Sequence, residues 1–318
     1  MRNALKSLLV KNPQCMLELQ YARRIHCVTT GLVMTCIVCG GSQIAGLTGW
    51  HATCRGCRYE SAALTPAINA PSTVPMDEAQ REAALKALRV QNFNTIVGYA
   101  KQHVSASKPR LLDVGSAHGW FLEAARGQFD VLGVEPDAEV GGRAAARGLP
   151  VRSGYFPDAV GRDERFDAIV FNDVIEHIPD IHSALAACHA HLNDGGILIL
   201  NLPSSRGFFY RVSKVLARIG WRGPFERMWQ KDMPSPHVHY FDPHNLRELV
   251  LRQGFTMAKT AELPALRAEG LMERLRYVGK AAPVSLYLQY IVIRCAIPVL
   301  SVFPSDIIVS IFKKKAAS

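Results

Sequence analysis

The feature that most constrains the fold is the stretch LLDVGSAHG at residues 111–119. An apolar run leads into Asp113, and Gly115 and Gly119 follow it at the spacing D-x-G-x-x-x-G. Gly115 can adopt the positive φ of a tight turn, and Gly119 lets the backbone approach a ligand closely. The stretch predicts a buried strand, a glycine turn and a helix whose first N–H groups face that ligand. The spacing matches neither the dinucleotide fingerprint G-x-G-x-x-G nor a phosphate loop ending in G-K-[ST].

A second apolar strand, VLGVEPD at 131–137, ends in Glu135. In a βαβ unit an acid at this position can accept both hydroxyls of a ribose. Together the two motifs resemble the class I S-adenosylmethionine (SAM)-dependent methyltransferases over about 107–262, with a last strand at 307–313. The resemblance implies a Rossmann-like α/β fold: a mostly parallel seven-stranded sheet with an antiparallel last strand. It also implies SAM as the cofactor.

The rest of this region alternates strand and helix patterns. The predicted strands are 110–114, 130–135, a third with its loop at 149–158, 166–173, 196–203 and a sixth beginning at 254. Predicted helices include 119–127, 138–147 and a long one that Asp77 caps, with Gln80 as its box partner. We expect this long helix to lie beside the first strand, over the edge of the cofactor.

Two C-x-x-C pairs precede that helix, and 14 residues separate them. Four thiolates in this arrangement are typical of a tetrahedral structural zinc, with no position left open for water. The expected ligands are Cys36, Cys39, Cys54 and Cys57. The other four cysteines are scattered, which suits a reducing compartment better than a disulfide framework. His51, between the pairs, is expected on the surface.

The chain divides into four expected parts. They are a basic, poorly ordered extension at 1–33, a zinc ribbon at 34–62, a linker at 63–76 and a methyltransferase domain at 77–318 with cap insertions at 204–241 and 264–303. Met34 directly precedes the ribbon, so the extension can also be an upstream mis-start of the reading frame. We find no convincing secretory signal, because Lys11 and Asn12 interrupt the N-terminal apolar run, and we expect a cytoplasmic protein.

The residues expected around the cofactor lie at the ends of the predicted strands. They are Asp113, Gly115, Ser116, Gly119, Glu135, Tyr155, Phe156, Asn172 and Asp173. Asp113 should face the positive methionine end of SAM, and Glu135 the ribose. Tyr155 or Phe156 can stack on the adenine, although packing in the core is the alternative for each. Asn172 and Asp173 end the fourth strand, at the crevice where open α/β sheets bind ligands.

Glu176 and His177 follow directly and are the candidate catalytic residues. The methyl sulfonium is already electrophilic, so the protein has to align the acceptor and remove its proton, for which His177 has a suitable pKa. The block Asp173-x-x-Glu176-His177 resembles the E-x-x-E-H metal block of ubiquinone-pathway O-methyltransferases and small-RNA end methyltransferases. There a divalent metal polarises the acceptor hydroxyl, but Asp replaces the first Glu here. Metal ligand, base or orienting group, and structural residue remain open roles for His177.

Three functions compete. The ribbon before such a domain resembles sugar and polysaccharide-cluster methyltransferases, which implies O-methylation of a hydroxyl on a sugar, glycan or lipid-linked small molecule. An RNA methyltransferase fits the net charge of +10, but the fourth strand lacks the N/D-P-P-aromatic motif of base amino methylation. A non-enzymatic binding protein is disfavoured, because both cofactor motifs are intact.

Two further segments point to an anionic membrane. Residues 206–231 hold seven Arg or Lys and one acid, Glu226, in a basic amphipathic pattern. Residues 284–303 are apolar apart from Arg294, and Lys313, Lys314 and Lys315 follow. We expect peripheral binding at the inner face of the membrane; the alternatives are two cap helices packed on the domain and a spanning helix at 284–303, against which Arg294 argues. His237 and His239, next to the first segment, can face the acceptor pocket or pack in the core.

Overall fold

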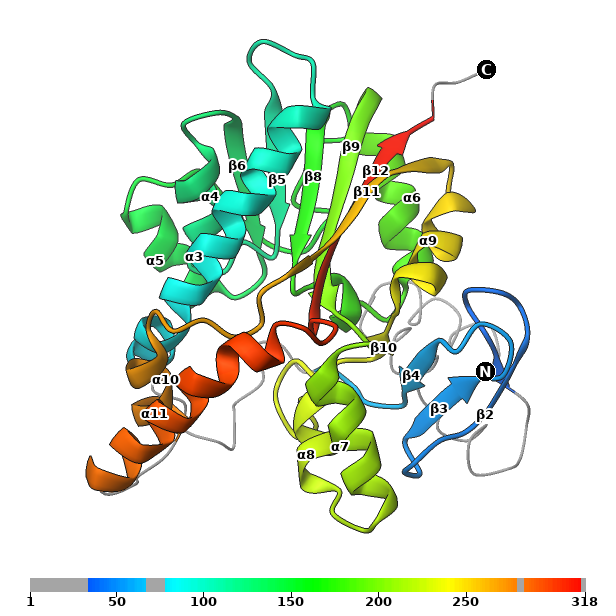
Figure 1. Ribbon diagram of the computed structural model, residues 1–318. Helices are drawn as coiled ribbons and strands as arrows, with labels where there is room; N and C mark the ends of the chain where they lie inside the picture. Colours follow the sequence, from blue (N-terminus) through cyan, green and yellow to red (C-terminus); the bar gives the residue numbers. More distant parts are fainter. Residues whose placement is uncertain (1–33, 67–77, 279–282, 316–318) are drawn as a thin grey trace, which may run out of the picture.

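The computed structural model describes residues 34–66, 78–278 and 283–315 (Figure 1). A seven-stranded sheet forms its centre. Its strands are β5 (Arg110–Val114), β6 (Asp130–Glu135), β7 (Val151–Ser153), β8 (Phe166–Asn172), β9 (Leu192–Pro203), β11 (Phe255–Leu263) and β12 (Ile307–Lys314). They lie in the order β7-β6-β5-β8-β9-β12-β11. β5 to β9 run parallel, and β12 is antiparallel to both β9 and β11. The predicted fold class, including the antiparallel last strand, is confirmed.

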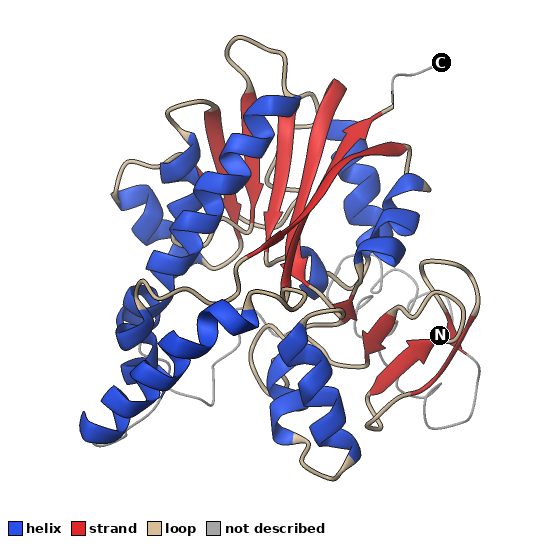
Figure 2. Cartoon of the chain, in the orientation of Figure 1, coloured by secondary structure: helices blue, strands red, loops and turns tan. Residues whose placement is uncertain are grey.

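Helices cover both faces of the sheet (Figure 2). One face carries α3 (Glu78–His103), α4 (Trp120–Ala125) and α5 (Ala138–Ala146), whose apolar side chains share a core with alternate residues of the strands. The other face carries α6 (Ile181–His191) and α9 (Pro243–Leu251), which bury Leu185 and Leu249 in a second core. Buried strands with helices on both faces account for the near-continuous apolar runs seen in the sequence.

The cap insertions lie at the carboxyl ends of the parallel strands. The first contains α7 (Phe208–Arg218), α8 (Gly223–Met228) and the short strand β10 (His239–Tyr240). The second contains α10 (Leu271–Val278) and α11 (Pro283–Leu300). Figure 1 shows α7, α8, α10 and α11 together at the lower end of the molecule. In the part of the chain that the structure describes, no helix is both long and apolar enough to cross a membrane.

The cysteine-rich region forms four strands of a second, five-stranded sheet. The sheet consists of β1 (Met34–Thr35), β2 (Ser42–Ala45), β3 (His51–Cys54), β4 (Glu60–Ala62) and β10, in that order. β10 pairs antiparallel with β4, so that His239 lies opposite Ser61 and Tyr240 opposite Glu60. The ribbon therefore receives its edge strand from an insertion of the large domain.

The ribbon also packs into the core of the large domain. Cys36, Val38 and Tyr59 belong to the same buried cluster as Leu249 on α9 and Leu185 on α6. The hydrogen bonds that cross the boundary include those from Tyr59 to His239, between His182 Nε2 and Ile37 O, and from Asn245 Nδ2 to Cys57 O. The two parts are held together by this packing as well as by the connecting chain.

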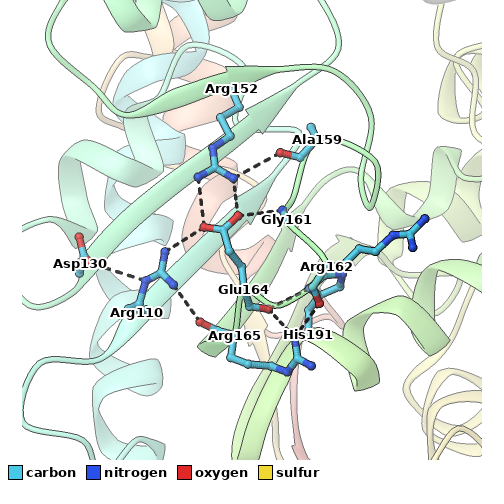
Figure 3. Close-up of polar contacts among 9 residues, drawn as sticks. All are labelled: Arg110, Asp130, Arg152, Ala159, Gly161, Arg162, Glu164, Arg165 and His191. Carbon is cyan, nitrogen blue, oxygen red and sulfur yellow. Dashed lines mark hydrogen bonds and ion pairs between the residues drawn. The ribbon is translucent and has the colours of Figure 1, made fainter.

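An ion-pair network fixes the loop between β7 and β8, which carries Tyr155 (Figure 3). Glu164 accepts hydrogen bonds from Arg152, Arg110 and the backbone N–H of Gly161. The bond from Arg152 contributes most to holding the pKa of the Glu164 carboxyl at about 2. Because Arg110 begins β5 and Arg152 lies on β7, the network connects the loop to two strands of the sheet.

Three expectations need correction. His51 is not a surface residue: it is 1% exposed, and its Nε2 donates to Glu60 at 2.8 Å. The fifth strand, expected at 196–203, starts four residues earlier, at Leu192. The C-terminal lysines, which were grouped with the two membrane-directed segments, are not close to them. Lys314 lies beside Leu192 and Asp194 at the end of β12, and β12 ends on the side of the sheet opposite the cap helices (Figure 1). Residues 1–33, Asp77 and most of the predicted linker lie outside the described residues.

Candidate functional site

The glycine turn between β5 and α4 has the backbone that the sequence predicts. Gly115 and Gly119 both have φ of 72°, in the left-handed region that favours glycine. A Cβ on Gly115 would lie 2.6 Å from Val174 Cγ2, so a side chain would clash as well as strain the turn. The hydroxyl of Ser116, in the same turn, is buried and has no hydrogen-bond partner among the described residues. A Cβ on Gly119 would clash with Leu149, so the structure explains this glycine by packing and not, as expected, by close approach of a ligand. The turn offers a ligand one unused polar atom, the hydroxyl of Ser116.

Glu135 ends β6 next to this turn. Its two carboxylate oxygens accept one bond each, from the N–H of Ala117 at 2.8 Å and of Asp137 at 2.9 Å. A carboxylate has about four acceptor positions, so two remain for the hydroxyls of a ribose. Burial raises the pKa of Glu135, although the two N–H bonds oppose this effect. The carboxyl group is 7% exposed, as expected for a group at the edge of a ligand site.

Polar side chains continue across the carboxyl ends of the neighbouring strands. Asn172 Nδ2 on β8 donates to Asp113 Oδ1 on β5 at 3.2 Å, and Asn201 Nδ2 on β9 approaches Asn172 Oδ1 at 3.4 Å. Asp113 is 1% exposed, and this burial raises its pKa to about 8 against the effect of the Asn172 bond. The structure thus brings Asp113, Glu135 and Asn172 together, and in the unliganded protein Asp113 is mainly protonated at pH 7.

The two aromatic candidates separate. Tyr155 is half exposed. Partial burial raises the pKa of its hydroxyl, and the negative charge of Glu135 raises it further. Tyr155 is therefore near the carboxyl group expected at the ribose. Phe156 instead packs edge-on against Phe171 and His191 in the core. Of the two, Tyr155 is the one available to stack on an adenine.

Glu176 lies in a short 3-10 turn after β8 and is fully buried. Neither of its carboxyl oxygens has a hydrogen-bond partner among the described residues. Its Oε1 lies 3.9 Å from His177 Nε2 and 4.0 Å from His237 Nε2, too far for direct hydrogen bonds. Three polar groups therefore surround one point without bonding to one another.

The rings of the two histidines are fixed by different partners. His177 Nδ1 donates to the carbonyl oxygen of Pro236 at 3.0 Å, which leaves Nε2 as the acceptor nitrogen. His237 Nε2 lies 2.9 Å from the side-chain amide of Gln230. Burial is the main cause of all three pKa shifts: it raises the pKa of Glu176 well above its usual value and lowers those of His177 and His237. Burial therefore disfavours the charged form of all three groups.

Asp173 does not join this cluster. It has φ of 55°, and its carboxylate forms an ion pair with Arg89 of α3 at 3.3 Å. Lys86, one turn earlier on α3, lies over the ring of Trp120 at the start of α4. The long helix thus crosses the carboxyl edge of the sheet beside the glycine turn.

Comparisons with known proteins agree with this geometry. A family model described as a methyltransferase domain matches residues 78–260, which is more than half of the chain. The chain belongs to this family. It carries a SAM-dependent methyltransferase domain, with the glycine turn, Glu135 and Asn172 at the carboxyl edge of the sheet.

Curated relatives of the methyltransferase domain are ubiquinone biosynthesis O-methyltransferases. The protein of Cereibacter sphaeroides is 31% identical over 154 residues, which cover 46% of this chain and 59% of the relative. That of Paramagnetospirillum magneticum is 36% identical over 131 residues, covering 38% and 52%. The chain therefore spans roughly half the length of the curated relatives it matches. These relatives are distant, and each match covers less than half of this chain.

Solved structures share the fold at low identity. Haemonchus contortus phosphoethanolamine N-methyltransferase 2 has a TM-score of 0.52 at 14% identity, covering 75% of this chain and 57% of that one. Magnesium protoporphyrin IX methyltransferase from Synechocystis has a TM-score of 0.48 at 11% identity, covering 77% and 90%.

The four cysteines predicted as zinc ligands come together in front of the methyltransferase domain. Cys36 Sγ lies 3.5 Å from Cys57 Sγ, and Cys39 Sγ lies 3.5 Å from Cys54 Sγ. All four sulfur atoms lie within 4.8 Å of one another. Tetrahedral Zn–S bonds of about 2.3 Å require S–S separations of about 3.8 Å, so the cluster is consistent with a zinc ribbon.

His237 is the site residue whose role the sequence left unspecified. It lies some sixty residues after the catalytic block in the chain, and only the packing of the first cap insertion brings it to Glu176. The stretch PSPHVHYF does not by itself distinguish His237 from His239, because the two histidines are only two residues apart. His239, the second of them, is buried between Tyr59 and the carbonyl oxygen of Ile178 and has a structural role.

Proposed function

We propose that this protein transfers a methyl group from SAM to a hydroxyl group of a sugar, glycan or lipid-linked small molecule. The observation that carries the proposal is the buried, unpartnered carboxyl group of Glu176 between His177 and His237. A group that binds there has one acidic and two imidazole contacts at the edge of the cofactor turn. The O-methyltransferase activity in the names of the relatives supports the same type of acceptor atom.

His177 is the proposed base. Its Nδ1–H is fixed by Pro236, so Nε2 presents its lone pair to the space in front of Glu176. Because burial lowers its pKa, the ring is neutral and able to accept a proton at physiological pH. Glu176 and His237 orient the acceptor hydroxyl, while Glu135 and the glycine turn hold the cofactor.

The same three residues fit a divalent cation. One carboxylate oxygen and two imidazole nitrogens, whose atoms lie within 4.8 Å of one another, form a ligand set that such ions accept. A cation bound to Glu176, His177 and His237 would polarise the acceptor hydroxyl. Asp173, the first residue of the block that resembles a metal site, is engaged by Arg89.

At the four-cysteine cluster we propose one structural zinc ion. All four positions of a tetrahedral ion would be filled by Cys36, Cys39, Cys54 and Cys57, so the site would have no catalytic role.

The test follows a radiolabelled methyl group from SAM into cell-extract fractions separated into RNA, protein, glycan and lipid. We expect label in the glycan or lipid fraction, resistant to ribonuclease and to mild base, as an ether is. Glu176→Gln should reduce transfer by about 10²-fold with SAM binding retained, because the acceptor hydroxyl is no longer oriented. Glu135→Ala should instead weaken SAM binding by about 1.5–3 kcal/mol. Label recovered only in RNA, or full transfer by the Glu176 variant, would contradict the proposal.

A further inference from the structure

A pocket of about 600 Å³ lies between the ribbon and α7, away from the glycine turn. Thr53 and Glu60 of the ribbon strands form one wall, and α7 forms the other. Ser205 and Asp242, which follow β9 and precede α9, complete the lining. Figure 1 shows the ribbon and α7 next to each other below the sheet. The volume is within the range of small-molecule binding sites.

The lining is strongly basic. It contains Arg58, Arg206, Arg211, Lys214 and Arg218. Arg211, Lys214 and Arg218 are spaced three and four residues apart, so they share one face of α7. Like charges at this spacing repel each other and destabilise a helix. The accumulation therefore needs a physical reason, such as an anion that these residues hold.

The two acids of the lining are already engaged. Glu60 is bonded to Lys214 at 2.7 Å, to His51 and to Tyr210. Asp242 Oδ1 accepts the first N–H groups of α9 as its N-cap. The lining has four arginines: Arg58, Arg206, Arg211 and Arg218. The ion pairs found among the described residues include none of them. Four guanidinium groups thus border one pocket without an ion-pair partner among the described carboxylates.

We infer that this pocket binds a phosphate or diphosphate group. Guanidinium groups present paired N–H donors that match phosphate oxygens, and several of them around one cavity can hold more than one phosphate. Lys214 already has a carboxylate partner, so the arginines are the residues that bind the anion. Glu60 keeps the two walls together, because it connects β4 to Lys214 and Tyr210 of α7.

The pocket adjoins the Glu176 cluster. The N–H of Val238 donates to the carbonyl oxygen of Glu176, and two residues later Tyr240 pairs with Glu60 of the pocket wall. Two residues of extended chain span about 7 Å. An acceptor with its phosphate in the pocket would therefore place its sugar or lipid portion near Glu176. This link to methyl transfer rests on the proposed function, whereas phosphate binding itself does not.

The test measures binding of inorganic pyrophosphate to the full-length protein by calorimetry. Arg211→Gln with Arg218→Gln removes two guanidinium groups of the pocket. Arg222→Gln with Arg227→Gln removes two exposed arginines of the same insertion that do not line it, which matches the change in net charge. We expect the pocket variant to lose at least tenfold in pyrophosphate affinity and the control to stay within about twofold. Unchanged SAM affinity in both variants would show that they are folded.

Two results would overturn the inference: no saturable binding by the wild type up to about 5 mM pyrophosphate, or equal losses in both variants. Two competitors distinguish the source of the phosphate. Uridine diphosphate N-acetylglucosamine represents a soluble ligand, and phosphatidylcholine vesicles that contain phosphatidic acid represent a lipid headgroup. Competition of either one with pyrophosphate supports the site. A single-stranded RNA oligonucleotide that binds more tightly than both, with an affinity that falls steeply with salt, would replace this inference with RNA binding.

Discussion

Asp113 is a buried acid whose charge state should change when the cofactor binds. Its pKa of about 8 lies above neutral pH because burial disfavours the carboxylate, and the charge of Glu135 adds to this effect. SAM carries a positive sulfonium and a positive amino group, and a nearby cation lowers the pKa of an acid. If Asp113 faces that end of the cofactor, it is protonated in the free protein at pH 7 and ionised in the complex.

We therefore predict that SAM binding at pH 7 releases nearly one proton. Calorimetric titrations in buffers with different ionisation enthalpies measure this number directly. The release should decrease above pH 8, where Asp113 is already ionised, and Asp113→Asn should abolish it. Equal proton release by wild type and variant would place Asp113 away from the charged end of the cofactor.

At the scale of the element, the ribbon is coupled to the large domain through β10. The buried carboxylate of Glu60 bonds to His51 within the ribbon and to Tyr210 and Lys214 of α7. Tyr240 of β10 stacks on Tyr210 with ring centroids 4.0 Å apart. Loss of the four-cysteine cluster should thus disturb the insertion that carries His237, and not only the ribbon itself.

We predict that Cys36→Ser reduces bound zinc from one equivalent to below half and lowers the melting temperature of the whole chain. Cys295→Ser is the matched control, because Cys295 is exposed and lies outside the cluster. SAM affinity should change little, since the glycine turn and Glu135 lie on other elements, whereas methyl transfer should decrease. A wild-type preparation with less than half an equivalent of zinc under reducing, chelator-free conditions would contradict the assignment.

The elements themselves were largely readable from local signals. The strands at 110–114, 130–135, 166–173 and 307–313 are apolar runs, as predicted. Asp180 and Asp242 cap helix N-termini and Gly148 follows a helix C-terminus, positions where these residue types are common. What the sequence could not provide were pairings between distant segments. His51 is buried only because Glu60 lies across the hairpin, and His237 reaches Glu176 only because β10 joins the ribbon. Asp173 turns away because Arg89 lies on a helix that begins almost a hundred residues earlier.

At the scale of the whole molecule, the carboxyl edge of the sheet gathers all the functional features. The glycine turn follows β5, the Glu176 cluster follows β8, and the basic pocket lies between the ribbon and α7. The cap helices α7 and α11 lie at the lower end of the molecule (Figure 1). α11 exposes an apolar stripe with Val284, Leu288 and Val292 at intervals of four residues. The exposed side chains of Val215, Ile219 and Trp221 lie on and just after α7. An acceptor embedded in a membrane would approach the site from this side.

The last prediction is that the protein binds peripherally to anionic membranes through this end. Apolar side chains of α11 would enter the interface, and the basic residues of α7 would each contribute about 1 kcal/mol near an anionic surface. Lys313, Lys314 and Lys315 cannot assist, because β12 carries them to the opposite end of the sheet. A spanning arrangement of α11 would place Arg294 in the bilayer, at a cost of about 2.5–3.5 kcal/mol.

Flotation with vesicles decides between peripheral binding, a packed cap and a spanning helix. We expect the wild type to float with phosphatidylcholine vesicles that contain phosphatidylglycerol, not with phosphatidylcholine alone, and to be released by high salt. Leu288→Ser with Val292→Ser should abolish binding, because the apolar stripe is interrupted, while Ile44→Ser on the ribbon, another exposed apolar side chain, should leave it intact. No flotation at all would show that α11 is only a cap, and resistance to salt and carbonate would show that it inserts fully.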